Sequence, residues 1–144
     1  MSPATAVALL STKPKTPRSR AFEVAMTPDR VRVAQIRRIA VAHMRLWAVP
    51  TPMAEEARLV VSELVTNAIE HGRGAVLLRM RHTDDKLRIE VTDENPAHAQ
   101  LQEADREDLC GRGLFLVASL ADVWGVSGNG RTTWAAFSLA RGTG

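Results

Sequence analysis

The chain has 144 residues, of which 45% are hydrophobic and 24% charged, and this composition indicates one globular domain rather than a disordered protein. It contains no apolar run of the roughly 18 residues that a membrane-spanning helix needs, and its single cysteine, Cys110, cannot form an internal disulfide. These features exclude an integral helical membrane protein and a disulfide-stapled secreted domain, so we expect a cytoplasmic protein.

The formal net charge of +3 comes from the first part of the chain. Residues 1–20 carry four basic residues and no acid, a charge of +4 that leaves −1 for residues 21–144. Because this segment also contains three prolines and little apolar patterning, we predict that it forms a basic, disordered tail. The near-neutral remainder does not favour direct binding of nucleic acid, although the tail could tether an acidic partner.

Strands and helices are predicted to alternate after the tail. We expect a first strand at residues 21–26 and a helix at residues 27–47, which begins with the capping pair Thr27-Pro28. Apolar residues recur along this helix at intervals of three and four, which indicates one buried face. A second helix follows from residue 51 to Gly72, and we expect the glycine to end it in a left-handed conformation.

The second predicted helix carries three polar side chains at intervals of four, Glu63, Asn67 and His71. At about 100° per residue, Asn67 and His71 lie at the edge of the apolar face, and Glu63 lies just outside it. A carboxylate at the rim of an apolar wall suits a general base, and the side-chain oxygen of Asn67 suits a hard cation such as Mg²⁺. The alternative is a solvated polar flank of an amphipathic helix.

Two further strands are predicted at residues 75–81 and 86–93. In the second, apolar residues alternate with polar ones up to Val91, and the same alternation places Asp93 on the apolar face. A buried acid needs a partner, so we interpret Asp93 as the acceptor for a ligand donor such as the exocyclic amine of adenine. The alternative is that the strand ends and Asp93 begins a turn.

Residues 95–110 are polar, acidic and almost free of apolar side chains, which is typical of a lid or an insertion. The run Gly111-Arg112-Gly113-Leu114 follows, directly before a helix predicted at residues 115–121. Glycines before a helix let a phosphate approach the backbone, and the helix N-terminus supplies free amide hydrogens. Arg112 suits bidentate phosphate binding. The alternatives are a plain glycine hinge and an arginine that points into water.

The predicted elements end with a hairpin of strands at residues 123–126 and 132–139. Thr132 and Thr133 are candidates to lie near a ligand, although threonine is ordinary in a strand. The whole order indicates an α+β fold, a two-layer sandwich in which helices cover one face of a mixed, largely antiparallel sheet. The aromatic residues of the hairpin are expected in the core: Trp124, Trp134 and Phe137.

Taken in order, these motifs resemble the GHKL ATPase superfamily, whose members share the Bergerat fold. The resemblance rests on ELVTNAIEHG at residues 63–72, on Asp93 at a strand end, on the long polar segment, and on GRGL opening a helix. Within the superfamily, the compact length and the run GRGLFLVASLADVWGV most resemble the bacterial anti-sigma-factor serine/threonine kinases and their ATP-binding relatives. An ATP-binding kinase domain is therefore expected at residues 21–142.

The resemblance implies roles for the matching positions. Glu63 resembles the general base toward the attacking hydroxyl or water, and Asn67 resembles the ligand of the Mg²⁺ that bridges the ATP phosphates. Asp93 resembles the aspartate that fixes the adenine amino group, and residues 111–113 resemble the glycine box that contacts phosphates beneath a lid. The implied cofactor-binding set, for ATP and Mg²⁺, is Asn67, His71, Asp93, Gly111, Arg112, Gly113, Leu114 and Thr132.

The resemblance also implies a function and partners. The function is that of an ATP-dependent protein serine/threonine kinase that phosphorylates a small anti-sigma-factor antagonist and sequesters a sigma factor, with a homodimer possible. Two departures leave alternatives open, because no glycine closely follows Asp93, where many relatives carry glycines, and no phospho-acceptor histidine domain precedes the motifs. The second argues against a complete sensor histidine kinase. The alternatives are a regulatory ATP-binding module with little or no kinase activity and a scaffold that binds no nucleotide.

Overall fold

The computed structural model describes residues 7–11, 19–95, 111–127 and 130–138. The elements of this part of the chain are, in order, β1 (Val7–Ser11), β2 (Arg20–Met26), α1 (Arg32–Leu46), α2 (Thr51–His71), β3 (Val76–Thr83), β4 (Lys86–Thr92), α5 (Gly111–Leu120), β5 (Val123–Ser127) and β6 (Thr132–Ser138). None of the described helices is both long and apolar enough to cross a lipid bilayer.

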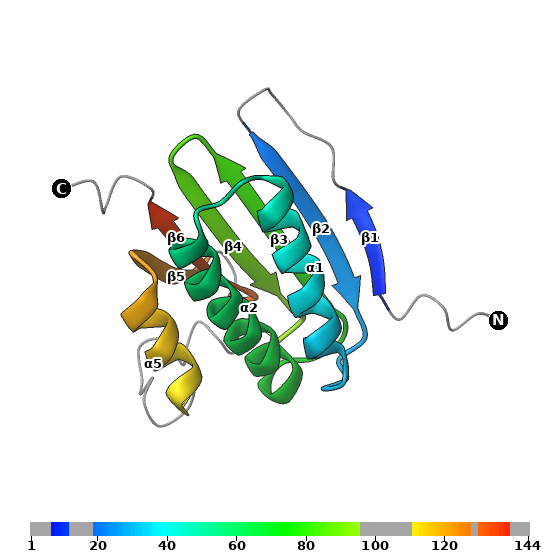
Figure 1. Ribbon diagram of the computed structural model, residues 1–144. Coiled ribbons are helices and arrows are strands. Elements are labelled where there is room, and N and C mark those ends of the chain that lie inside the picture. Colours follow the sequence, from blue (N-terminus) through cyan, green and yellow to red (C-terminus); the bar gives the residue numbers. More distant parts are fainter. Residues whose placement is uncertain (1–6, 12–18, 96–110, 128–129, 139–144) are drawn as a thin grey trace.

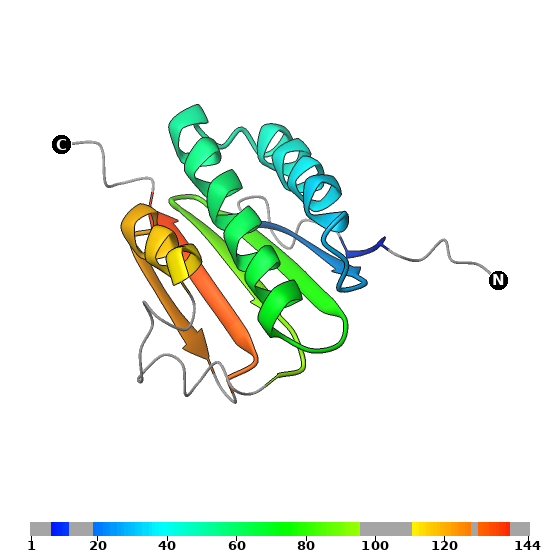
Figure 2. The same cartoon turned by 90° about the horizontal axis from the view of Figure 1, so that it is seen from below.

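The strands form one six-stranded sheet in the order β1-β2-β3-β4-β6-β5, and every described pairing is antiparallel. The helices α1, α2 and α5 all lie on the same face of this sheet, with α2 between the other two (Figure 1). The view in Figure 2 shows the two layers from below, and none of the described helices lies on the other face of the sheet. The predicted two-layer α+β sandwich is confirmed.

The core lies between the sheet and the helix layer because the strands alternate strictly. β4 buries every second residue, and its alternate side chains face away from the helices. α2 contributes the longest buried stripe of the helices, from Met53 to Ala68. Phe137 is buried, as predicted. Trp134 differs from the prediction: β6 buries Thr133, Ala135 and Phe137, which places Trp134 on the open face of the sheet.

The helix α1 begins later than the sequence predicts. The amide of Asp29 donates to the carbonyl of Thr27 at 2.8 Å, and the amide of Arg32 donates to the carbonyl of Asp29 at 2.8 Å. These bonds form a turn at residues 27–31, so the pair Thr27-Pro28 does not cap the helix. Val31 precedes the first helical turn without a side-chain capping bond.

The prediction of a disordered tail over residues 1–20 is wrong for Val7–Ser11. This segment is strand β1, which pairs antiparallel with β2, for example through Val7 opposite Met26. Its residues pair with the edge of β2 that β3 leaves open. The composition of the segment alone does not reveal this long-range pairing. The sheet therefore starts before residue 21, and residues 1–6 and 12–18 of the predicted tail lie outside the described part.

Candidate functional site

The end of α2 and the end of β4 meet at Gly72. A Cβ atom at this position would lie 2.5 Å from both Cγ and Oδ2 of Asp93, which is closer than a side chain tolerates. The backbone of Gly72 is extended, with φ of −92° and ψ of −162°, so the left-handed conformation predicted for it is wrong. What this position requires is the absence of a side chain, and the resulting contact holds Asp93 against the last turn of α2.

Asp93 is only 3% exposed, and it follows β4 directly. It stays attached to the sheet because its amide donates to the carbonyl of Arg131 at 3.0 Å. Its Oδ1 accepts a hydrogen bond from the amide of Asn95 at 2.6 Å, and the Asn95 side chain donates to the carbonyl of His71 at 2.9 Å. Asp93 is therefore buried, as the alternation in β4 predicts, and it also begins a turn. Its role as the acceptor for a ligand donor stays a prediction.

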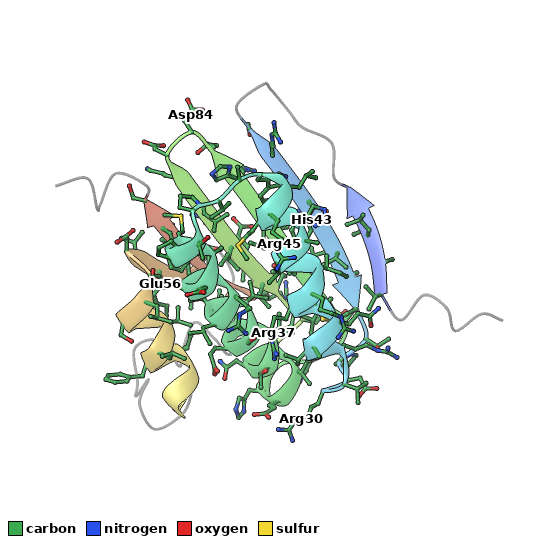
Figure 3. All side chains as sticks on the ribbon, in the orientation of Figure 1. Arg30, Arg37, His43, Arg45, Glu56 and Asp84 are labelled. Carbon is green, nitrogen blue, oxygen red and sulfur yellow. The ribbon has the colours of Figure 1, made fainter. Side chains whose placement is uncertain are left out.

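Glu63 and Asn67 are half-buried on one flank of α2. The opposite flank faces α1, because Nε of Arg37, which is labelled in Figure 3, donates to Ser62 Oγ at 2.8 Å. At about 100° per residue, Asn67 lies roughly 140° around the helix from Ser62, and Glu63 about 100°. Asn67 therefore lies on the flank toward α5, and Glu63 lies at the solvent edge of that flank.

The helix α5 begins at Gly111, so the glycines predicted to precede it lie in its first turn. Leu114 is 5% exposed and Val117 is fully buried, which anchors the helix on the core. Its first turn lies at the same end of the molecule as the last turn of α2 and the end of β4 (Figure 1). The side chains of residues 111–113, including Arg112, are outside the described part, and so are residues 96–110 of the lid predicted at residues 95–110.

Three regions of one end thus come together from separate parts of the chain: the flank of α2, the acid after β4 and the start of α5. A family model described as the histidine kinase-like ATPase domain matches residues 25–137, well over half of the chain. The chain belongs to the histidine kinase-like ATPase family. This result confirms the superfamily indicated by the sequence motifs. A search among curated proteins found no match.

Two residues of the predicted cofactor-binding set, His71 and Thr132, are placed differently in this histidine kinase-like ATPase domain from what the sequence predicts. The His71 side chain is 48% exposed with Nε2 at 4.0 Å from Glu70 Oε1, and the contact of His71 with the Asp93 region is made by its backbone carbonyl. Thr132 lies on the open face of the sheet, where its hydroxyl is 2.7 Å from that of Thr92. The structure does not bring Thr132 to the side chain of Asp93.

Of the two threonines predicted as candidates, Thr133 rather than Thr132 lies on the covered face of the sheet. It is 8% exposed and pairs with Val91, on the face of the sheet that the helices cover. The period of two, counted back from Phe137 through Ala135, leads to Thr133 and could have selected it over Thr132. Gly72 and Asn95 also belong to the site, but their roles depend on contacts with Asp93 and His71 that no local pattern reveals.

The polar side chains at this end suit the ATP binding that the family implies. Asp93 presents a buried carboxylate, which accepts hydrogen bonds, and Asn67 presents a half-buried carboxamide. Among the residues that the structure describes, no group of three His, Cys, Asp or Glu side chains could by itself hold a metal ion. Asn67 would supply a single oxygen to Mg²⁺, a cation commonly bound through one or two protein groups together with nucleotide phosphates.

Proposed function

We propose that this protein is an ATP-dependent protein serine/threonine kinase of the anti-sigma-factor type. The observation that carries the proposal is the meeting of α2, the end of β4 and the start of α5 at one end of the molecule (Figure 1). Phosphoryl transfer asks a protein mainly for alignment, charge neutralisation and a placed base. The side chains of Glu63, Asn67 and Asp93 supply groups suited to these tasks.

Each side chain has a role in the proposed reaction. Asp93 would accept a hydrogen bond from the adenine amino group, which fixes the nucleotide. Asn67 would hold Mg²⁺, whose positive charge neutralises the phosphates. Glu63, at the solvent edge of its flank, would accept the proton of a serine or threonine hydroxyl as the hydroxyl oxygen attacks the γ-phosphorus and ADP leaves.

The protein substrate in this proposal is a small anti-sigma-factor antagonist, and the sequestered partner is a sigma factor. Both come from the resemblance of ELVTNAIEHG and GRGLFLVASLADVWGV to the anti-sigma-factor kinases. The proposed place of action is the cytoplasm, where ATP and sigma factors are present. The alternative is a regulatory module that binds ATP without transferring phosphate.

Glu63→Gln tests the role of Glu63 as the general base. The purified chain, given Mg²⁺, γ-labelled ATP and candidate antagonist proteins, should produce a phosphoprotein. The variant should lower the transfer rate by about a hundredfold or more, because a general base contributes on the order of 10²–10⁴ to such a step. Its affinity for ATP, measured by calorimetry, should change little.

Glu55→Gln is the matched control, because Glu55 is exposed and lies in the first turns of the same helix. This variant should transfer phosphate at the natural rate. Equal transfer by Glu63→Gln would remove Glu63 as the base. Tight ATP binding with no transfer to any candidate by the natural chain would favour the regulatory module.

A further inference from the structure

The face of the sheet opposite the described helices, seen edge-on in Figure 2, carries a row of paired charges. Glu23, Arg79 and Glu90 are direct neighbours across β2, β3 and β4. The Nε atom of Arg79 lies 2.6 Å from Glu23 Oε2, and its Nη1 lies 3.6 Å from Glu90 Oε1. Arg79 therefore engages both carboxylates of this row.

Arg88 also pairs with a carboxylate of this row. Its Nε lies 2.7 Å from Glu90 Oε2, and its guanidinium carbon lies 4.3 Å from the ring centroid of Trp134. Trp134 is itself supported by Gly125, where a Cβ would lie 3.1 Å from the ring. An ion pair and a cation–π contact thus hold Arg88 against Glu90 and Trp134.

Arg81 differs from Arg79 and Arg88, because no ion pair of the described residues includes it. It lies directly opposite Arg88 in the β3–β4 register, and like charges in directly opposed positions destabilise a sheet. Its side chain is exposed, and no carboxylate of the described residues pairs with it. Arg81, Arg88 and Ala21 border a hollow of about 260 Å³ in the open face.

We infer that this hollow is a docking site for an acidic side chain of a partner protein, with Arg81 as the group that binds the carboxylate. The hollow is smaller than the roughly 300–1,000 Å³ typical of sites for whole small molecules, so it suits a single side chain. Arginine and tryptophan are enriched at the centres of protein interfaces. A planar guanidinium binds a carboxylate through two parallel hydrogen bonds.

The net charge of the hollow favours a carboxylate over a phosphate as its ligand. The hollow is lined by three arginines and two glutamates, Arg79, Arg81, Arg88, Glu23 and Glu90, which gives it a net charge of +1. One carboxylate neutralises that charge. A phosphate group or a nucleic acid backbone would bring more negative charge against Glu23 and Glu90, so an acidic protein segment is the occupant that this surface fits.

The test uses a capped hexaglutamate peptide as the probe and the full chain without nucleotide at about 0.15 M salt, where distant charges are screened. Binding is followed by the indole N–H signal of Trp134 in NMR spectra, because Arg88 lies over that ring. The peptide should shift this signal, and Arg81→Gln should raise the dissociation constant at least fivefold. Arg38→Gln should leave it unchanged, because Arg38 is exposed on α1, which lies on the covered face.

Inorganic phosphate and a short single-stranded DNA serve as the competing probes. Weaker Arg81-dependent shifts with these probes than with hexaglutamate would support the inference. Absence of a shift with the peptide, equal binding by Arg81→Gln, or tighter Arg81-dependent binding of phosphate or DNA would overturn it. None of these outcomes depends on the kinase proposal, because the hollow lies on the other face of the sheet from the helices.

Discussion

Gly72 and Asp93 touch because one residue lacks a side chain and the other is a short acid. The carboxyl group of Asp93 fills the space that a Cβ at Gly72 would need. The neighbouring turn then uses the same carboxyl group, since its Oδ1 accepts the amide of Asn95. At the scale of single residues, the position of the proposed adenine acceptor is therefore set by a glycine at a helix end.

Gly72→Ala should weaken ATP binding by about tenfold or more, equivalent to about 1.4 kcal/mol. The added methyl group would lie 2.5 Å from Cγ of Asp93 and closer still to the carbonyl oxygen of Ala68, so Asp93 and the last turn of α2 must move apart. Calorimetric titration with Mg²⁺ and ATP measures the change, and Asp93→Ala should show a similar loss. Gly125→Ala is the control, because the atoms nearest to its Cβ would be those of the Trp134 ring on the open face. ATP affinity that is unaffected by Gly72→Ala would contradict this role.

The surroundings of a second residue, His82, lower its pKa. Its ring is stacked nearly parallel to Trp47, at 5° and 6.1 Å between centroids, and no described residue forms a hydrogen bond with its Nε2. Burial lowers the pKa of His82 below its ordinary value of 6.5, the positive charge of Arg20 lowers it further, and Asp84 acts in the opposite direction. The folded state therefore favours the neutral ring.

The sign of the pH effect follows from this lowered pKa. Between the lowered pKa and 6.5, the unfolded chain binds more protons at His82 than the folded chain does, so the free energy of unfolding should fall as pH falls through this window. His82→Phe keeps a ring against Trp47 and removes the titration. Urea unfolding at pH 7.5 and 5.5 should show a smaller pH dependence for the variant, and an equal dependence would contradict the assignment.

At the scale of elements, α2 is fixed by its neighbours on both sides. Ser62 accepts a hydrogen bond from Arg37 of α1, and Glu70 pairs with Arg30 just before α1 at 2.9 Å. The α5 helix packs along the other flank. The strand β1 is less securely held, because it has one neighbour among the described strands and because Leu9 and Leu10 are more than half exposed.

Deletion of residues 1–11 should lower the free energy of unfolding by on the order of 2 kcal/mol. The deletion removes the hydrogen bonds between β1 and β2, and the entropy cost of ordering β1, which is also removed, offsets part of this loss. Affinity for ATP should not change, because β2 and β3 lie between β1 and β4 in the sheet. Urea midpoints measure the loss. Deletion of residues 1–6 is the control that keeps β1 intact. Equal midpoints for the two truncations would show that β1 adds no stability.

At the scale of the whole molecule, the sequence predicts the layers and the order of elements from β2 onward. Regular periods in α2, β3, β4 and β6 carry that information, and the position of Asp93 follows from the alternation in β4. The sequence does not predict contacts between distant segments. The pairing of β1 with β2 and the approach of Gly72 to Asp93 are of this kind. The helix cap predicted at Thr27-Pro28 is wrong because a local turn uses the same residue types.

The place of β6 in the sheet constrains the order in which this protein can be assembled during translation. β6 lies between β4 and β5, so β4 has only one neighbour until residues 132–138 have been synthesised. Until they emerge from the ribosome, the nascent polypeptide exposes an incomplete sheet whose open edge could pair with other chains. The final insertion of a central strand, rather than the addition of an edge strand, therefore completes the domain.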